Sequence, residues 1–132
     1  MATITAGITI TSNQATASTP GPLTFALSLD NTDALTVDGK VIAEVEEVTT
    51  SASAHKIFDA TTTAESYIYL NNISDTNIFV CKTSGSGATA DRFMMLKAGE
   101  AAFFPWAGGQ DLHLDHGAAG TKKCEYFIFV QA

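Results

Sequence analysis

Alternation of apolar and polar residues, rather than a helical period, marks most of this chain. Residues 3–11 set Ile and Ala against Thr and Gly with a period of two, and residues 23–29 repeat the pattern with Leu and Phe. Between these segments, a stretch rich in Thr, Ser and Ala ends at Pro20-Gly21-Pro22, which interrupts regular structure. No segment combines a period of 3.6 residues with capping residues. The pattern predicts an all-β protein.

A β-hairpin is predicted in the first half of the chain. Residues 35–37 and 41–48 flank Asp38-Gly39, a dipeptide that favours tight two-residue turns. Residues 41–48 also have helix propensity, but Val45 and Val48 favour a strand.

The second half reads as short strands divided by turns. Strands are predicted at 67–70, 77–82, 92–96, 101–106, 111–115 and 124–130. This spacing is typical of a β-sandwich or jelly roll. We therefore predict a jelly-roll-like β-sandwich with an extended N-terminal arm. Residues 1–22 form the arm and its Pro-Gly-Pro linker, and residues 23–132 form a single sandwich domain.

Apolar residues occupy both faces of some predicted strands. Adjacent strand residues point to opposite faces, so Phe103 and Phe104 cannot enter the same core. Residues 126–130 are all apolar, so this predicted strand also has apolar side chains on both faces. Such a strand is expected inside a sheet that is covered on both sides. Only 16% of the residues are charged, against about 25% in an average domain. In a small sandwich the outer cover comes from loops or neighbouring subunits, which favours an oligomer or an assembled lattice.

The charge balance excludes some function classes. The formal net charge of −7 argues against a nucleic-acid-binding protein, because such proteins need clustered Lys and Arg. No window of 18 apolar residues predicts a membrane span. The first residues lack the basic and apolar regions of a signal peptide, which favours synthesis in the cytoplasm.

The most suggestive polar cluster lies at residues 111–116. On a strand, Asp111, His113 and Asp115 share one face, and with His116 they would offer ligands for a divalent metal in a cupin-like metal- or sugar-binding protein. The alternative is a strand with one apolar face and a polar outer face, which explains the alternation completely. No sequence motif for nucleophilic catalysis or phosphate binding is present, so no enzyme, cofactor or metal is predicted.

Three smaller features read as structural. Cys81 and Cys124 lie in predicted strands and are expected to be buried free thiols. His55 reads as part of a loop. Asn72-Ile73-Ser74 has the form of a glycosylation sequon but is expected to be a turn.

About half the chain resembles small virion proteins of tailed bacteriophages. The resemblance is carried by residues 67–72 (YIYLNN), 77–80 (NIFV), 96–106 (LKAGEAAFFPW) and 125–129 (EYFIF). It implies a non-enzymatic structural protein of a phage particle. The leading expectation is a capsid decoration (cement) protein on the capsid surface, with the major capsid protein and further copies of itself, as a trimer, for partners. A tail, neck or fibre-associated component is the alternative.

The expected contacts with these partners lie in the arm and in an aromatic run. The arm, 3–11, would add a strand to a capsid sheet, although an ordinary first strand of its own sheet explains it equally well. Phe104 and Trp106 would lie on an aromatic contact face. The predicted partner-contact residues are Thr3, Ile4, Thr5, Ile8, Ile10, Phe104 and Trp106.

Overall fold

The computed structural model describes residues 2–4, 7–13, 24–30, 35–49, 55–82 and 91–131, with side chains from Ile42 onward. These residues contain eleven strands and no helix, so the all-β prediction is confirmed, and no helix among them is suited to crossing a membrane. The strands are β1 (Ala2–Ile4), β2 (Gly7–Asn13), β3 (Thr24–Asp30), β4 (Leu35–Val48), β5 (Lys56–Phe58), β6 (Ser66–Asn72), β7 (Ile78–Cys81), β8 (Arg92–Leu96), β9 (Ala101–Trp106), β10 (Leu112–Asp115) and β11 (Lys122–Gln131).

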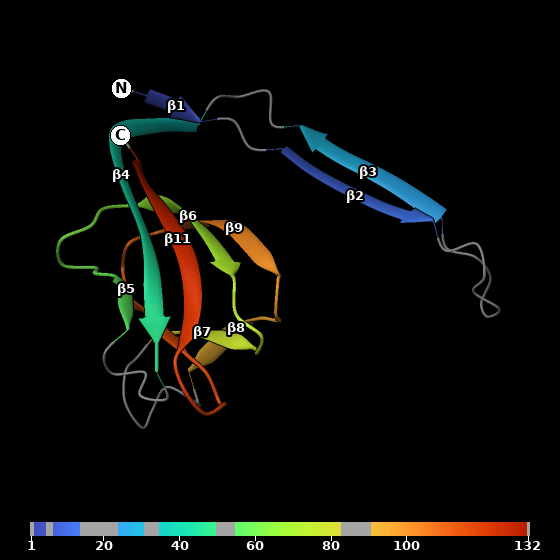
Figure 1. Cartoon of the computed structure of the whole chain (residues 1–132). Coiled ribbons are helices and arrows are strands. Elements are labelled where there is room, and N and C mark those ends of the chain that lie inside the picture. Colours follow the sequence, from blue (N-terminus) through green and yellow to red (C-terminus); the bar gives the residue numbers. More distant parts are fainter. Residues whose placement is uncertain are drawn as a thin grey trace.

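Two antiparallel sheets pack into the predicted β-sandwich. One has five strands in the order β1-β4-β11-β6-β9, and the other has four in the order β5-β10-β7-β8. Figure 1 shows the long strands β4 and β11 side by side, with the short strands β7 and β8 next to the lower end of β11. The strands β2 and β3 form a separate two-stranded ribbon and, among the described strands, pair only with each other.

The core lies between the two sheets and follows from the period of two. Along β11 every second side chain, including Tyr126 and Ile128, is buried, and β6 alternates in the same way through Ile68 and Leu70. The facing sheet contributes further buried side chains. These are Ile57, Phe58, Ile78, Val80, Leu96, Leu112 and Leu114. Each buried Leu, Ile or Phe contributes about 1.5–3 kcal/mol relative to exposure, so this cluster holds the sheets together.

The last strand, β11, is the central strand of its sheet. It pairs with β4 on one side and with β6 on the other. The prediction that this strand pairs inside a sheet is therefore confirmed. Its position sends Phe127 and Phe129 to the side of the sheet turned away from the core, since their neighbours Tyr126 and Ile128 point inward.

The predicted hairpin at Asp38-Gly39 is wrong, because β4 runs through it without a turn. Phe129 pairs with Val41 and Gln131 with Val37, so three β4 residues stand opposite Val130 alone. This is a β-bulge, a place where Gly is favoured and where a strand bends. Figure 1 shows β4 curving sharply near its start. The same dipeptide that favours a tight turn here allows a long strand to change direction.

The predicted first strand at 3–11 divides into two strands with different partners. β1 joins β4 at the edge of the five-stranded sheet, whereas β2 pairs with β3. For β1, the reading as an ordinary strand of its own sheet holds. The linker Pro20-Gly21-Pro22 lies outside the described residues, and the boundary after residue 22 stays a prediction. One strand, β5, was missed, since it has only three residues.

Candidate functional site

The predicted polar cluster on β10 has the expected alternation but not the expected exposure. Leu112 and Leu114 enter the core, which places His113 and Asp115 on the opposite face. The reading as a strand with one apolar face and a polar opposite face is therefore confirmed, but the polar face is not exposed to solvent: His113 and Asp115 are each only 5% exposed and His116 only 2%. Their burial means that each polar group must find a partner within the fold or cost stability.

The carboxylates of this cluster are held by cations of the same sheet. Lys56 Nζ lies 2.7 Å from Asp111 Oδ2, and this hydrogen bond lowers the pKa of Asp111. Asp115 is paired with the Arg92 guanidinium. His116 Nε2 lies 3.0 Å from the carbonyl oxygen of Val48. Within the described ranges, no three His, Cys, Asp or Glu side chains are grouped so that they could hold a metal ion.

His113 is the one member of the cluster with an unsatisfied atom. Its buried Nδ1 has no hydrogen-bond partner among the described residues. Burial lowers the pKa of His113 below its usual 6.5, because protonation would place a charge away from water.

We expect this histidine to make the fold less stable in mild acid. Since the pKa of His113 is lower in the folded chain, the unfolded chain takes up the proton first as the pH falls through 6.5. The stability present above pH 6.5 is then lost progressively below it. Urea unfolding at pH 7.5, 6.5 and 5.5 should show a falling free energy of unfolding, and His113→Leu should reduce that fall. An equal fall in both proteins would contradict the assignment to His113.

The two cysteines are free and buried, as predicted. Burial raises the pKa of Cys124 to about 11 and also raises the pKa of Cys81. Both thiols are therefore protonated at neutral pH and poor nucleophiles. His55, which was expected in a loop, is also buried and lies beside β5 with its Nδ1 3.0 Å from Glu46 Oε1.

A larger candidate site is the outward face of the five-stranded sheet. The strand registers align Phe127 with Tyr69 and Tyr69 with Phe103 in one row, and Phe129 with Tyr67 in the next. Ring centroids are 6.0 Å apart for Tyr67 and Phe103, 5.8 Å for Tyr69 and Phe127, and 6.4 Å for Phe127 and Phe129. We call these five residues the aromatic face. Contacts between the rings leave each only partly exposed.

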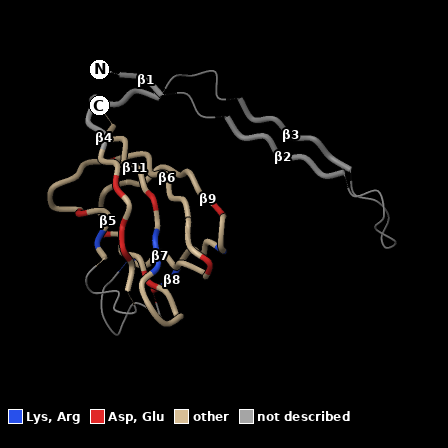
Figure 2. The backbone as a smooth tube through the Cα atoms, viewed as in Figure 1, with Lys and Arg blue, Asp and Glu red and all other residues tan. Residues whose placement is uncertain are grey.

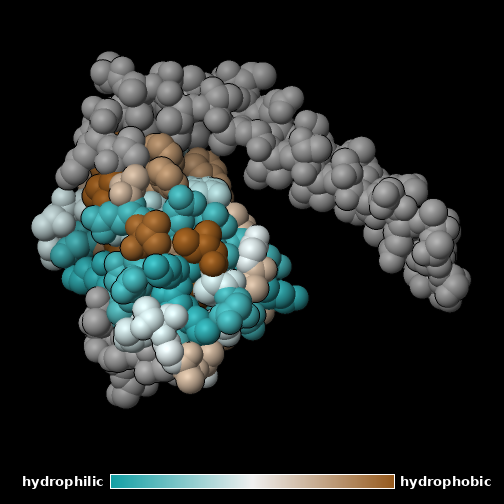
Figure 3. Space-filling model, viewed as in Figure 1, coloured by the Kyte–Doolittle hydropathy of each residue, from teal (hydrophilic) through white to brown (hydrophobic). Residues whose placement is uncertain are grey.

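Apolar surface continues from the aromatic face onto β4. Val45, on the outward side of β4 by its pairing with Glu125, is 52% exposed. Figure 3 shows hydrophobic residues (brown) in the middle of the side formed by β4 and β11, bordered by hydrophilic ones (teal). Charged residues lie along β4 and β11, including the pair Lys123 and Glu47, whereas β6 contains none (Figure 2). An apolar centre with a polar border is typical of a surface that another protein covers.

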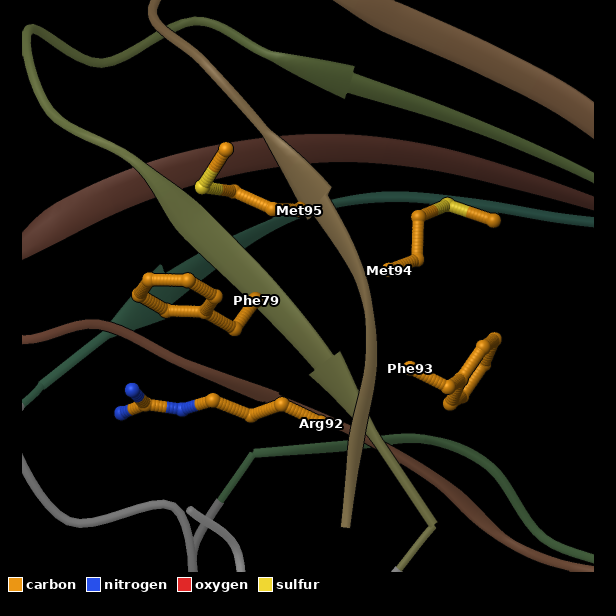
Figure 4. A pocket seen from close by; sticks show the side chains of 5 residues that line it. All are labelled: Phe79, Arg92, Phe93, Met94 and Met95. Carbon is orange, nitrogen blue, oxygen red and sulfur yellow. The ribbon is translucent and has the colours of Figure 1, made fainter. Parts of the chain in front are cut away.

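Two shallow grooves flank the edge strand β8. The first, of about 260 Å³, is lined by Phe79, Arg92, Phe93, Met94 and Met95 (Figure 4). In Figure 4 the Arg92 side chain extends along Phe79, and its guanidinium carbon lies 4.0 Å from the centre of that ring. Phe93 and Met95 are 42% and 44% exposed.

The second groove, of about 710 Å³, lies between the sheets at β8 and β9. It is lined by Lys82, Phe93, Pro105, Trp106, Ala107, Gly109 and Gln110. The Phe93 and Trp106 rings stack with their centroids 5.8 Å apart, and Lys82 Nζ lies 5.9 Å from the Phe93 ring. Trp106 Nε1 donates a hydrogen bond to the carbonyl oxygen of Gln110. The indole is therefore already satisfied and fixed.

The predicted partner-contact residues are distributed over several places. Phe104 and Trp106 pack against the core, although Trp106 also lines the second groove. Thr3 and Ile4 lie on β1, Ile8 and Ile10 lie on β2, and Thr5 is outside the described residues. The outward residue of the aromatic run is instead Phe103. The aromatic face was missed as a set because its members come from three strands whose register the sequence does not show.

Comparisons with protein-family models, with curated proteins and with solved structures found no match to this chain.

Proposed function

We propose that this chain is a non-enzymatic structural protein of a phage particle, and that it decorates the capsid. The observation that carries the proposal is the aromatic face: a sheet whose core side is already filled presents five further aromatic rings on its other side. Aromatic side chains bury large areas, and they are often among the residues that supply most of the binding free energy at protein interfaces. A sandwich with one sheet apolar on both sides is suited to assembly.

The edge strand β1 supports the same role. It is the outermost strand of the five-stranded sheet, and within the part of the chain that the structure describes it pairs with β4 along one side only. A strand of a capsid protein added beside Thr3 and Ile4 would extend the sheet through main-chain hydrogen bonds. The net charge of −7 suits the exterior of a shell filled with DNA, since it discourages non-specific binding to nucleic acid.

The test is binding to capsid shells stripped of accessory proteins. We expect the purified chain to co-sediment with the shells and to raise their disruption temperature, because a ligand that binds only the assembled shell stabilises it by mass action. Deletion of residues 2–6, which removes β1, should weaken binding at least tenfold while the sandwich stays folded by circular dichroism. A chain that ignores shells but co-sediments with purified tails or necks would instead place it there, and binding to neither would overturn the proposal.

A further inference from the structure

The strand β8 is an open edge of the four-stranded sheet. It pairs with β7 on one side, and none of the described strands pairs with its other side. Among the described residues, one further hydrogen bond reaches its main chain, where the carbonyl oxygen of Leu96 accepts from Asn72 Nδ2. The other main-chain groups along this side, between Arg92 and Met95, have no partner in the same set of residues. A row of unpaired N–H and C=O groups is complementary to one kind of ligand, an extended polypeptide.

Two other sheet edges carry features that discourage strand addition. β5 has only three residues and begins at Lys56, which is ion-paired with Asp111. β9 contains Pro105, which has no N–H group to donate. β8 contains neither proline nor lysine, and its one charged residue, Arg92, lies at its start. Since charged side chains and proline are common means of protecting an edge, β8 is less protected by its side chains than β5 and β9.

Apolar side chains lie on both sides of this open edge. Figure 4 shows Phe93 on one side of β8 and Met95 on the other. The register with β7 shifts near the start of β8, and Phe93 has no partner on β7. Its ring stacks instead on Trp106 of the other sheet. The groove that contains Phe79 and Met95 and the groove that contains Phe93 and Trp106 therefore flank the same strand.

The two grooves also carry positive charge without a carboxylate of their own. Their described lining residues include Arg92 and Lys82 but neither Asp nor Glu. Arg92 is already paired with Asp115. Lys82 is exposed, and within the described part of the chain its ammonium group lies near the Phe93 ring and forms no ion pair. A ligand with an acidic group next to an apolar one would match both the charge and the ring.

We propose that β8 binds an extended peptide segment of another protein as an added strand. Successive side chains of a strand point to opposite faces, so alternate residues of the peptide enter the two grooves while its main chain pairs with β8. The residues over Phe79 and Met95 are apolar. Those on the other side include an acidic residue toward Lys82 and an apolar residue toward Phe93. The inference goes beyond the decoration role, because it names a second edge of the sandwich and the chemistry of its partner.

A synthetic probe tests this binding mode on the full chain. The probe is the acetylated and amidated peptide Ser-Val-Glu-Val-Phe-Val-Ser, in which Val forms one face and Glu and Phe form the other. We expect saturable binding with a Kd below about 1 mM, measured by titration calorimetry. Replacing the Glu of the probe by Lys should weaken binding about tenfold or more, because two cations then meet. Lys82→Glu in the protein should restore the binding of this Lys probe.

Methylation of the probe's amide nitrogens distinguishes strand pairing from simple apolar adhesion. Alternate amides of an added strand point toward β8, so methyl groups on one alternate set should abolish binding and those on the other set should not. In the protein, Phe93→Ser and Met95→Ser should each weaken binding about tenfold, and Met95→Ser leaves the stack of Phe93 on Trp106 intact. Val45→Ser, on the other sheet, is the matched control and should leave the affinity unchanged, since Val45 is similarly exposed.

Circular dichroism shows whether each variant remains folded. No saturable binding of the parent probe, equal losses from both methylated sets, or an unchanged affinity in both the Phe93 and Met95 variants would each overturn the proposal. These measurements use no capsid shells, so failure here leaves the decoration role as it stands, and failure to bind shells leaves this inference as it stands.

Discussion

Asn72→Leu is expected to destabilise the fold by about 3–5 kcal/mol. Asn72 is fully buried at the end of β6, and its Nδ2 donates to the carbonyl oxygens of Thr76 at 2.7 Å and Leu96 at 2.9 Å. Its Oδ1 accepts from both the amide and the hydroxyl of Ser74. The apolar side chain would leave the buried carbonyl oxygen of Leu96 unpaired, at about 1–3 kcal/mol, and would remove three part-buried hydrogen bonds of the turn, at about 0.5–1.5 kcal/mol each. Urea unfolding of the two proteins measures the difference.

Asn71→Ala is the matched control for this substitution. Asn71 is the preceding residue of β6 but lies on the outward face, where its amide donates a single hydrogen bond of 3.2 Å to Glu125 Oε2. Loss of that single, part-buried bond should cost about 0.5–1.5 kcal/mol. Similar costs at both positions would show that the buried network does not hold the turn between β6 and β7. The same network holds Asn72-Ile73-Ser74 in a turn. It also buries and hydrogen-bonds the side-chain amide of Asn72, the group that glycosylation would modify.

The fold could be predicted from the sequence wherever local alternation of apolar and polar residues decides the structure. β8 and β9 begin and end at the predicted residues, and β11 was expected as a central strand because both of its faces are apolar. Alternation is a property of single residues and their neighbours, so it can be read without knowing which strands meet.

Prediction failed where long-range pairing decides the structure. Asp38-Gly39 is a hairpin signal only if the flanking segments pair with each other. Here residues 41–48 pair with β11, whereas residues 35–37 pair with β1 and, at Val37, with the end of β11. The candidate site shows the same limit. The sequence indicated that Phe103 and Phe104 face opposite ways, but the choice between them depends on the register of β6 against β9. Phe104 is the predicted contact residue, but it packs against the core, and the register gives the outward position to Phe103.

Ile128→Ala is expected to cause the second large loss of stability. Ile128 points into the core, whereas its neighbours on β11 point outward. Ile128 is fully buried on the central strand, and truncation of a buried Ile costs about 2–5 kcal/mol through lost burial and the cavity that remains. A loss of about 3 kcal/mol should lower the thermal midpoint by roughly 10 °C in a domain of this size. Differential scanning calorimetry measures both quantities.

Phe129→Ala tests the same strand on its other face. Phe129 lies on the aromatic face, only partly exposed and stacked on Phe127, so its truncation leaves the core intact. In the isolated monomer we expect Phe129→Ala to lower the free energy of unfolding by at least about 1 kcal/mol less than Ile128→Ala does, although Phe is the larger side chain. The reason is that the Phe129 ring is only partly buried, whereas the Ile128 side chain is fully buried. A core residue is expected to cost stability at every protein concentration. Truncation of a residue that serves assembly should lower stability mainly under conditions where copies of the chain associate. The difference in free energy of unfolding between the two variants should therefore decrease as the protein concentration rises. If Phe129→Ala proved as damaging as Ile128→Ala in dilute monomer, the outward rings would belong to the folding of the single chain and not to its assembly.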